Sequence, residues 1–208
     1  MKLFLIGASG MIGSRILAEA TARGHQVVAA SRAPENIVQG AGVTPVKVDA
    51  TDADALQAKA AEADVILSAS SPRSTGDAVA DATALGAALI GAASNLGKRV
   101  VVVGGAGTLN LPDGTPVLNV LPPEIVPEAT GMKAVRDALA QSTLDWSFVA
   151  PAAQIAPGAR TGTFRVGGDV LLSDAEGTSA ISAEDYAIAF MDEVETPAHI
   201  KQVFTVAY

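Results

Sequence analysis

The sequence predicts a doubly wound α/β fold, in which a parallel sheet carries helices on both faces and a small C-terminal region covers one end. Three observations support this prediction. Short, continuous apolar runs alternate with helical patterns, as in parallel strands that are buried on both faces. A glycine-rich turn lies directly between the first apolar run and the first helical pattern. The length of 208 residues fits one domain, with a core at residues 1–150 and a cap at residues 151–208.

The predicted strands are the short runs rich in valine, isoleucine and leucine. Helical spacing of apolar residues separates them, beginning with Ile12, Ile16 and Ala20 in the first helix, which Gly24 can end. A glycine- and proline-rich loop at residues 104–123 follows the fifth strand. The expected strands are residues 3–6, 26–31, 44–48, 65–67, 100–103 and 146–149, and the other core helices are residues 52–61, 75–96 and 127–141.

After the sixth strand, which Pro151 ends, the sequence predicts a substrate-covering cap of short strands and one helix. Ser182 is expected to cap that helix with its hydroxyl, while Asp185 three residues later reaches back. Apolar residues at helical spacing predict the buried face of this helix, which consists of Tyr186, Ala189, Phe190 and Val194.

The composition argues against several classes of function. A net charge of −8 opposes binding to nucleic acid or to an anionic membrane surface. The chain has no cysteine, which excludes disulfides and thiolate catalysis. Metal binding is not expected, because only His25 and His199 supply imidazole, and both are interpreted as structural.

The first residues enter a predicted strand at once and leave no room for a signal peptide, so we expect a cytoplasmic protein. The longest uncharged stretch, residues 82–97, is shorter than the roughly 18 apolar residues of a membrane span. It is interpreted as a buried helix.

The glycine-rich turn predicts a dinucleotide-binding site. Gly7, Gly10 and Gly13 are spaced three apart between a strand and a helix, which lets backbone amides approach a pyrophosphate at the helix N-terminus. Ser9, Met11 and Ile12 complete the predicted contacts within the turn. The alternative is an ordinary strand-to-helix turn without a ligand.

The end of the second strand favours NADPH over NADH. Proteins specific for NAD place an acid there, about 20 residues past the glycines, to accept the ribose hydroxyls. This chain instead has Ser31 and Arg32, whose hydroxyl and guanidinium can bind a 2′-phosphate. NADH use stays possible, because Arg32 could be a solvated surface residue and Glu35 could serve a ribose.

Further motifs follow in a definite order along nearly the whole chain. They are residues 7–13, Ser31-Arg32, Val48-Asp49-Ala50, residues 103–107, residues 145–148 with Pro151, Pro157-Gly158, and Asp185-Tyr186-Ala187. With these motifs the chain resembles the atypical short-chain dehydrogenase/reductases known as NADH-flavin reductases. It is more distantly similar to biliverdin-IX beta reductase and to the regulators of nitrogen metabolite repression. The resemblance implies a Rossmann fold.

The resemblance also implies roles for residues after the third and fourth strands. Asp49 and Ala50 would contact the adenine side of the cofactor, and Ser68, Ala69 and Ser70 would lie beneath the nicotinamide ribose. The alternative for these segments is a strand end and a serine-rich turn.

One departure from the wider superfamily limits the chemistry. Typical members carry Tyr-x-x-x-Lys before the sixth strand, and the aligned segment here begins with Ala129 and ends with Lys133. Lys133 could bind the nicotinamide ribose or could be an ordinary solvated lysine. Without the tyrosine the chain has no positioned acid for ketone reduction, and we assign no catalytic residue.

A flavin or quinone is a less demanding acceptor, because its ring system delocalises the charge of an incoming hydride. We therefore expect an NADPH-dependent reductase of free flavin or a quinone-like acceptor, acting as a monomer or homodimer, with flavin as a diffusing substrate. A non-catalytic NADP(H) sensor is the alternative. Ligands of such sheets bind beyond the carboxyl ends of the strands, so the expected acceptor site consists of Gly104, Gly105, Ala106, Gly107, Thr108 and Pro151.

Overall fold

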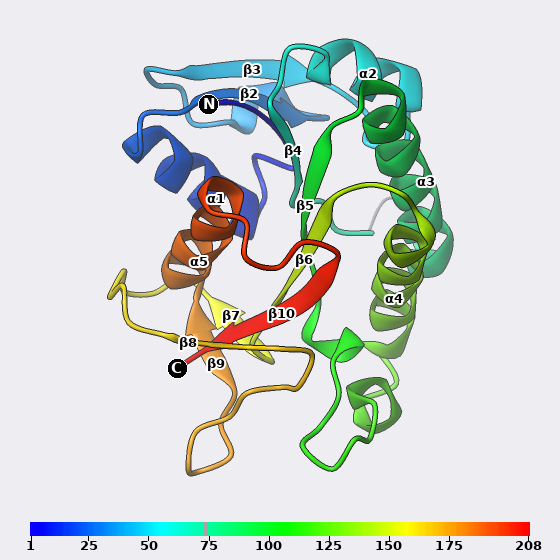
Figure 1. The fold of residues 1–208 in the computed structure, drawn as a ribbon, viewed down its shortest axis with the longest axis vertical. Coiled ribbons are helices and arrows are strands. Elements are labelled where there is room, and N and C mark those ends of the chain that lie inside the picture. Colours follow the sequence, from blue (N-terminus) through cyan, green and yellow to red (C-terminus); the bar gives the residue numbers. More distant parts are fainter. Residues whose placement is uncertain (73–74) are drawn as a thin grey trace.

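The computed structural model describes residues 1–72 and 75–208, and these form a central sheet of eight strands in the order β3-β2-β1-β4-β5-β6-β10-β8 (Figure 1). All neighbouring strands are parallel except β8, which is antiparallel to β10. The predicted doubly wound α/β fold is confirmed. The strands are β1 (Lys2–Ile6), β2 (Gln26–Ser31), β3 (Val43–Lys47), β4 (Val65–Ser68), β5 (Arg99–Val103), β6 (Trp146–Pro151), β8 (Arg165–Gly167) and β10 (Gln202–Ala207).

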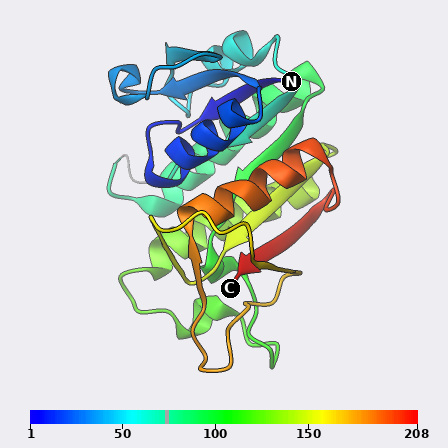
Figure 2. The same ribbon diagram turned by 90° about the vertical axis from the view of Figure 1, so that its left-hand side faces the viewer.

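Helices cover both faces of the sheet, as Figures 1 and 2 show. One layer contains α1 (Met11–Ala22) and α5 (Ala183–Glu195), and the other contains α2 (Ala53–Ala60), α3 (Ala78–Leu96) and α4 (Val126–Gln141). Alternating side chains of β1 belong to two separate cores: Leu3 and Leu5 pack toward α1 and α5, and Phe4 and Ile6 pack toward the other layer. Short 3₁₀ turns lie at η1 (Pro34–Asn36), η2 (Ala106–Thr108) and η3 (Val117–Val120).

The C-terminal segment differs from the expected cap. Its last strand, β10, is a full member of the main sheet between β6 and β8, and it pairs with β6 as far as Pro151. Its helix, α5, packs against α1 in the layer that covers the sheet, with Tyr186 and Phe190 fully buried. Only β7 (Gln154–Ala156) and β9 (Ala180–Ser182) form a separate two-stranded sheet. Part of the segment after residue 150 therefore completes the core.

The predicted cap of α5 is half correct. The Ser182 hydroxyl accepts the Asp185 amide hydrogen at 3.0 Å, as expected. The Asp185 carboxylate does not reach back to Ser182, because it accepts hydrogen bonds from Thr161, Gly162 and the Tyr208 hydroxyl at 2.5–2.9 Å. These bonds tie the loop after β7 to the start of α5.

Helix α3 begins at Ala78 rather than near residue 75, because the Asp77 side chain accepts the amide hydrogens of the first turn. It is long and apolar enough for a membrane span by length and composition, but its buried side packs on the sheet and against α4. At their crossing, a side chain on Gly131 would lie 2.7 Å from the Ala78 carbonyl oxygen. This close approach supports its interpretation as a core helix.

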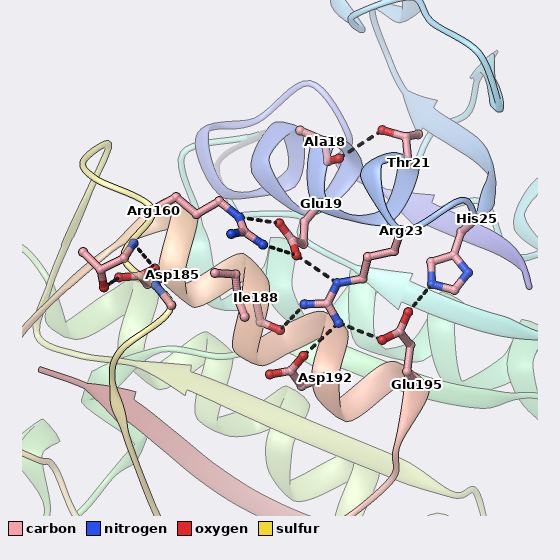
Figure 3. Close-up of polar contacts among 12 residues, drawn as sticks. Ala18, Glu19, Thr21, Arg23, His25, Arg160, Asp185, Ile188, Asp192 and Glu195 are labelled. Atoms are coloured by element: carbon pink, nitrogen blue, oxygen red, sulfur yellow. Dashed lines mark hydrogen bonds and ion pairs between the residues drawn. The ribbon is translucent and has the colours of Figure 1, made fainter.

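Whereas α3 and α4 approach each other closely at a glycine, ion pairs join α1 to α5. Buried Glu19 accepts hydrogen bonds from Arg23 at 2.8 Å and from Arg160 at 3.0 Å, and Arg23 also reaches Asp192 and Glu195 of α5 (Figure 3). The bonds from Arg160 and then Arg23 lower the pKa of the Glu19 carboxyl, although burial opposes them. The network therefore joins the carboxyl end of α1 to α5, and through Arg160 it also joins the loop after β7 to α1.

Both histidines have partners within the fold. A His25 ring nitrogen lies 2.7 Å from a Glu195 oxygen. His199 lies 2.8 Å from Glu193 and stacks on Phe204, with ring centroids 4.1 Å apart. These contacts support the expected structural role.

Candidate nucleotide-binding site

A cavity of about 240 Å³ lies at the carboxyl ends of β1, β2 and β4, at the point where the strand order reverses. Ligands of doubly wound sheets bind at such a switch point. Most of the residues predicted to bind the cofactor share this cavity. It is lined by Ile6, Gly7, Ser9, Gly10, Ala30, Ser31, Arg32, Val48, Asp49, Ala50, Thr51, Ala69, Ser70, Ser71, Pro72, Asp81 and Leu85.

The three glycines of the turn differ in what surrounds them. Gly7 has a φ of +80°, and a side chain there would lie 2.6 Å from the Ala69 carbonyl oxygen. A side chain on Gly13 would lie 2.1 Å from the Gly7 carbonyl oxygen. Gly10 is exposed, and among the described residues a side chain there would meet one atom within 4 Å, that same oxygen at 3.3 Å. Gly7 and Gly13 are therefore required by the turn itself, and Gly10 leaves open space beside it.

Hydrogen bonds connect the glycine turn to the end of β2. The Ser9 and Ser31 hydroxyl oxygens are 2.8 Å apart, and Ser31 also accepts the Ala33 amide hydrogen at 3.2 Å. Arg32 follows directly and lines the same cavity, whereas Glu35 is not among its lining residues. Two hydroxyls and a guanidinium thus meet where the sequence predicts the adenosine ribose.

Asp49 supplies the negative charge of the cavity on the β3 side. One carboxylate oxygen accepts the Thr51 amide hydrogen at 3.0 Å and the Thr51 hydroxyl at 2.8 Å. These hydrogen bonds, and the nearby positive charge of Arg32, hold the pKa of Asp49 below its ordinary value. Asp49 is therefore ionised at neutral pH and presents an acceptor.

Five predicted cofactor residues lie outside the cavity lining, and one of them is Gly13, which is buried in the first turn of α1. Met11 and Ile12 occupy the first turn of α1, and Ser68 is buried in β4. Lys133 on α4 is half exposed, and its ammonium donates to Asp137 at 2.6 Å. The structure does not bring these side chains together with the others.

Sequence reasoning missed several lining residues on the β4 side, namely Ser71, Pro72, Asp81 and Leu85. Asp81 is 7% exposed, and its carboxylate accepts both the amide and the hydroxyl hydrogens of Thr75. In the sequence, Asp81 lies within a helix expected over residues 75–96, and no local signal marks it as a lining residue.

The predicted acceptor residues lie apart from this cavity, at the ends of β5 and β6. The Phe148 ring would be 2.3 Å from a side chain on Gly104, and Ala129 would be 2.7 Å from one on Gly107. Buried Thr108 donates its hydroxyl to the Gly105 carbonyl oxygen at 2.8 Å. A side chain on Gly105 would meet no atom within 4 Å in the part of the chain that the structure describes, so this glycine has open space beside it. The other two positions are Ala106 in η2 and Pro151 in β6.

Both tyrosines have their hydroxyls engaged. Tyr186 is fully buried and donates to the Val149 carbonyl oxygen at 2.6 Å, and burial raises its pKa well above the ordinary value. The Tyr208 hydroxyl donates to Asp185 at 2.9 Å. Each hydroxyl thus serves the C-terminal part of the fold.

The residues present fit a dinucleotide. A bare backbone at Gly10, hydroxyls and a cation at the end of β2, and an ionised acid opposite are the groups that a pyrophosphate and an adenosine require. Comparison with known families agrees, because residues 7–197 match the NAD(P)H-binding family model. The chain belongs to the NAD(P)H-binding family.

Solved members and relatives cover the whole chain. A protein from Burkholderia pseudomallei described as a candidate exported protein is 43% identical, with a TM-score of 0.89 and full coverage of both chains. A candidate epimerase from Bacteroides thetaiotaomicron is 35% identical, with a TM-score of 0.93 over 100% of this chain and 96% of that one. A candidate NADH-flavin reductase from Streptococcus pneumoniae is 31% identical, with a TM-score of 0.85 over 100% and 99%.

Proposed function

We propose that this NAD(P)H-binding protein is an oxidoreductase that prefers NADPH and reduces free flavin or a quinone-like acceptor. The observation that carries the proposal is the polar cavity at the switch point, with Ser31 and Arg32 at the end of β2. When bound, the nicotinamide cofactor supplies a hydride. The Streptococcus relative named as a candidate NADH-flavin reductase supports the acceptor class.

Different residues of the chain would bind different parts of the cofactor. The turn around Gly10 offers backbone amides and the N-terminus of α1 to the pyrophosphate. Arg32 binds the 2′-phosphate together with the paired hydroxyls of Ser9 and Ser31. Ionised Asp49 accepts hydrogen bonds from the adenine side.

The acceptor class follows from the acids that are available. Reduction of an isolated ketone needs a positioned proton donor, which contributes about 10²- to 10⁴-fold in rate. Tyr186 and Tyr208 both donate to other groups of the fold. A flavin or quinone delocalises the added charge and can take its proton from solvent. What the protein must supply is position and exclusion of water.

Steady-state absorbance at the NADPH band tests the proposal, with a panel of flavins, quinones and aldehydes as acceptors. We expect NADPH oxidation with flavins or quinones and negligible rates with aldehydes. Rapid aldehyde reduction without flavin would contradict the chemical argument. Tight binding of both NADP⁺ and NADPH without turnover on any acceptor would favour a sensor instead.

The proposal treats flavin as a substrate that diffuses in and out. The purified protein should therefore be colourless, and its absorbance spectrum checks this directly. A yellow preparation with stoichiometric flavin would show that flavin is a resident cofactor.

We also propose that the protein acts in the cytoplasm, where nicotinamide cofactors are reduced again after each turnover. The Burkholderia relative described as a candidate exported protein makes this worth testing. Fractionation of the source cells, with immunodetection of the protein, would decide between the two compartments.

A further inference from the structure

One contact between helix α4 and the loop after β5 is made by a partly buried cation, Arg136. The Arg136 guanidinium donates to the Thr108 carbonyl oxygen, and its other terminal nitrogen lies 4.0 Å from an Asp169 carboxylate oxygen. The Arg136 side chain is only 23% exposed. A charged donor in such a position makes a stronger hydrogen bond than a neutral one.

Thr108 passes this constraint to Gly105. Its amide hydrogen and its hydroxyl both donate to the Gly105 carbonyl oxygen, at 3.0 and 2.8 Å. The carbonyl of Gly105 is therefore held toward Thr108. A side chain on Gly105 would meet no atom of the described residues within 4 Å, so there is open space beside its Cα.

Asp169 connects the same loop to the segment after β8. Its backbone carbonyl accepts the Asn110 amide hydrogen at 2.9 Å, and its carboxylate accepts the Asn110 side-chain amide at 3.2 Å. Arg136 thus lies where α4, the loop after β5 and the segment after β8 meet. The attachment of α4 to the core does not depend on it, because Gly131 and Val135 pack directly against α3.

We propose that Arg136 is a positioning residue for the acceptor: through Thr108 it holds Gly105 so that a flat ring can lie against the backbone. This inference rests on the proposed function, because it assigns the acceptor to the loop after β5. The contacts of Arg136 described above are with Thr108 and Asp169, so it would act on the acceptor through the loop. Its effect is confined to the geometry of residues 105–108.

The test compares Arg136→Ala, Arg136→Lys and a control, Gln141→Ala, which removes an exposed side chain from the same helix. Binding of FMN to the protein loaded with NADP⁺ is measured by quenching of flavin fluorescence, beside NADP⁺ affinity, the KM for FMN and hydrogen exchange at the Thr108 amide. We expect FMN binding and KM to worsen roughly tenfold in Arg136→Ala, the worth of one charge-assisted hydrogen bond. Lysine should recover part of the loss, because it can still donate to the Thr108 carbonyl.

In Arg136→Ala we also expect unchanged NADP⁺ affinity and faster hydrogen exchange at the Thr108 amide. The control Gln141→Ala should behave like the wild-type protein in every measurement. A second variant, Thr108→Val, removes the hydroxyl that orients Gly105 and should act in the same direction, with less than additive effect in combination. Wild-type FMN binding in Arg136→Ala would overturn the proposal, as would equal losses of FMN and NADP⁺ binding that lysine does not restore. Failure of the wild-type protein to bind or reduce any acceptor would instead overturn the proposed function.

Discussion

The two ends of the candidate site are built differently. At the cofactor end, the strand order leaves a cavity of about 240 Å³ that is lined by backbone and short polar side chains. At the proposed acceptor end, side chains of the protein occupy most of the space, with Phe148 against Gly104, Ala129 against Gly107 and Thr108 bonded to Gly105. The cavity at the cofactor end is therefore already formed without a ligand. At the proposed acceptor end, the space available to a ligand is mainly that beside Gly105.

This difference assigns different kinds of specificity to the two ends. A cavity with fixed hydroxyls, a guanidinium and a carboxylate can select one dinucleotide by charge and hydrogen bonding. A bare backbone surface with few polar groups can select an acceptor only by whether the acceptor is flat and whether it can reach the surface. We therefore expect strict recognition of the cofactor and a broad range of planar acceptors, and the following changes test that contrast.

The largest effects should come from the glycine turn. Gly13→Val should lower the free energy of unfolding by about 3 kcal/mol or more, because its side chain would overlap the Gly7 carbonyl oxygen. Gly10→Val should still fold, since Gly10 is exposed with ordinary backbone angles and a side chain there needs only a small shift from the Gly7 carbonyl oxygen, 3.3 Å away. It should weaken NADPH binding by about 100-fold or more by blocking the pyrophosphate. Thermal denaturation and fluorescence titration separate the two results, and wild-type affinity in Gly10→Val would place the nucleotide elsewhere.

Charge at the end of β2 should have the next largest effect. Arg32→Ala should weaken NADPH by roughly 10- to 150-fold, which corresponds to about 1.5 to 3 kcal/mol, and leave NADH almost unchanged. Arg32→Asp should invert the preference, because an acid repels the 2′-phosphate and accepts from ribose hydroxyls. Values of kcat/KM for both cofactors check this. Lys47→Ala, which removes an exposed cation at the end of β3, is the control and should change neither cofactor.

At the acceptor end, a bulky residue on Gly105 should obstruct the ring. Gly105→Leu should raise the acceptor KM about tenfold and leave NADPH affinity nearly intact. Gly91→Leu is a matched control on the outer side of α3, where a side chain also meets nothing within 4 Å. Equal loss of acceptor and NADPH affinity in Gly105→Leu would identify this glycine as structural.

The smallest effect should be a change of stability with pH at Asp185. Burial alone would raise its pKa, but hydrogen bonds from Thr161, Gly162 and Tyr208 outweigh this and lower it. A lowered pKa contributes stability that is present above the unfolded value, about 3.9, and is lost as pH falls through the folded value. Asp185→Asn should therefore lower the free energy of unfolding by about 1 kcal/mol at pH 7, and this difference should shrink as the pH falls below about 3.9 and through the folded value. Urea denaturation at pH 7 and at a series of lower pH values measures the difference, and a constant difference would contradict the prediction.

The same contrast explains how far sequence reasoning could go. Local patterns fixed the positions of most strands and placed Gly7, Gly10, Ser31, Arg32 and Asp49 at one edge of the sheet, where the cavity lies. That inference works because parallel strands bring their carboxyl ends together whatever their side chains are. The sequence does not predict Asp81 as a lining residue, because its place in the cavity depends on how α3 packs on the sheet.

Tertiary packing also decided the C-terminal segment. The run that forms β10 follows α5 after a short connection at residues 196–201, and nothing local predicts that it pairs with β6. The capping box at Ser182 failed for a similar reason, since Asp185 found stronger donors in Thr161 and Gly162. In both places, contacts with residues distant in sequence determine the structure, and local sequence patterns do not reveal them.

The place of β10 has a consequence for biosynthesis. Because residues 202–207 lie between β6 and β8, the growing polypeptide exposes the unpaired edge of β6 until β10 leaves the ribosome. Unpaired edges invite association with other chains, and pairings between distant segments form slowly. Damage to β10 should therefore reduce the yield of protein in cells more than it reduces the activity of the molecules that do fold.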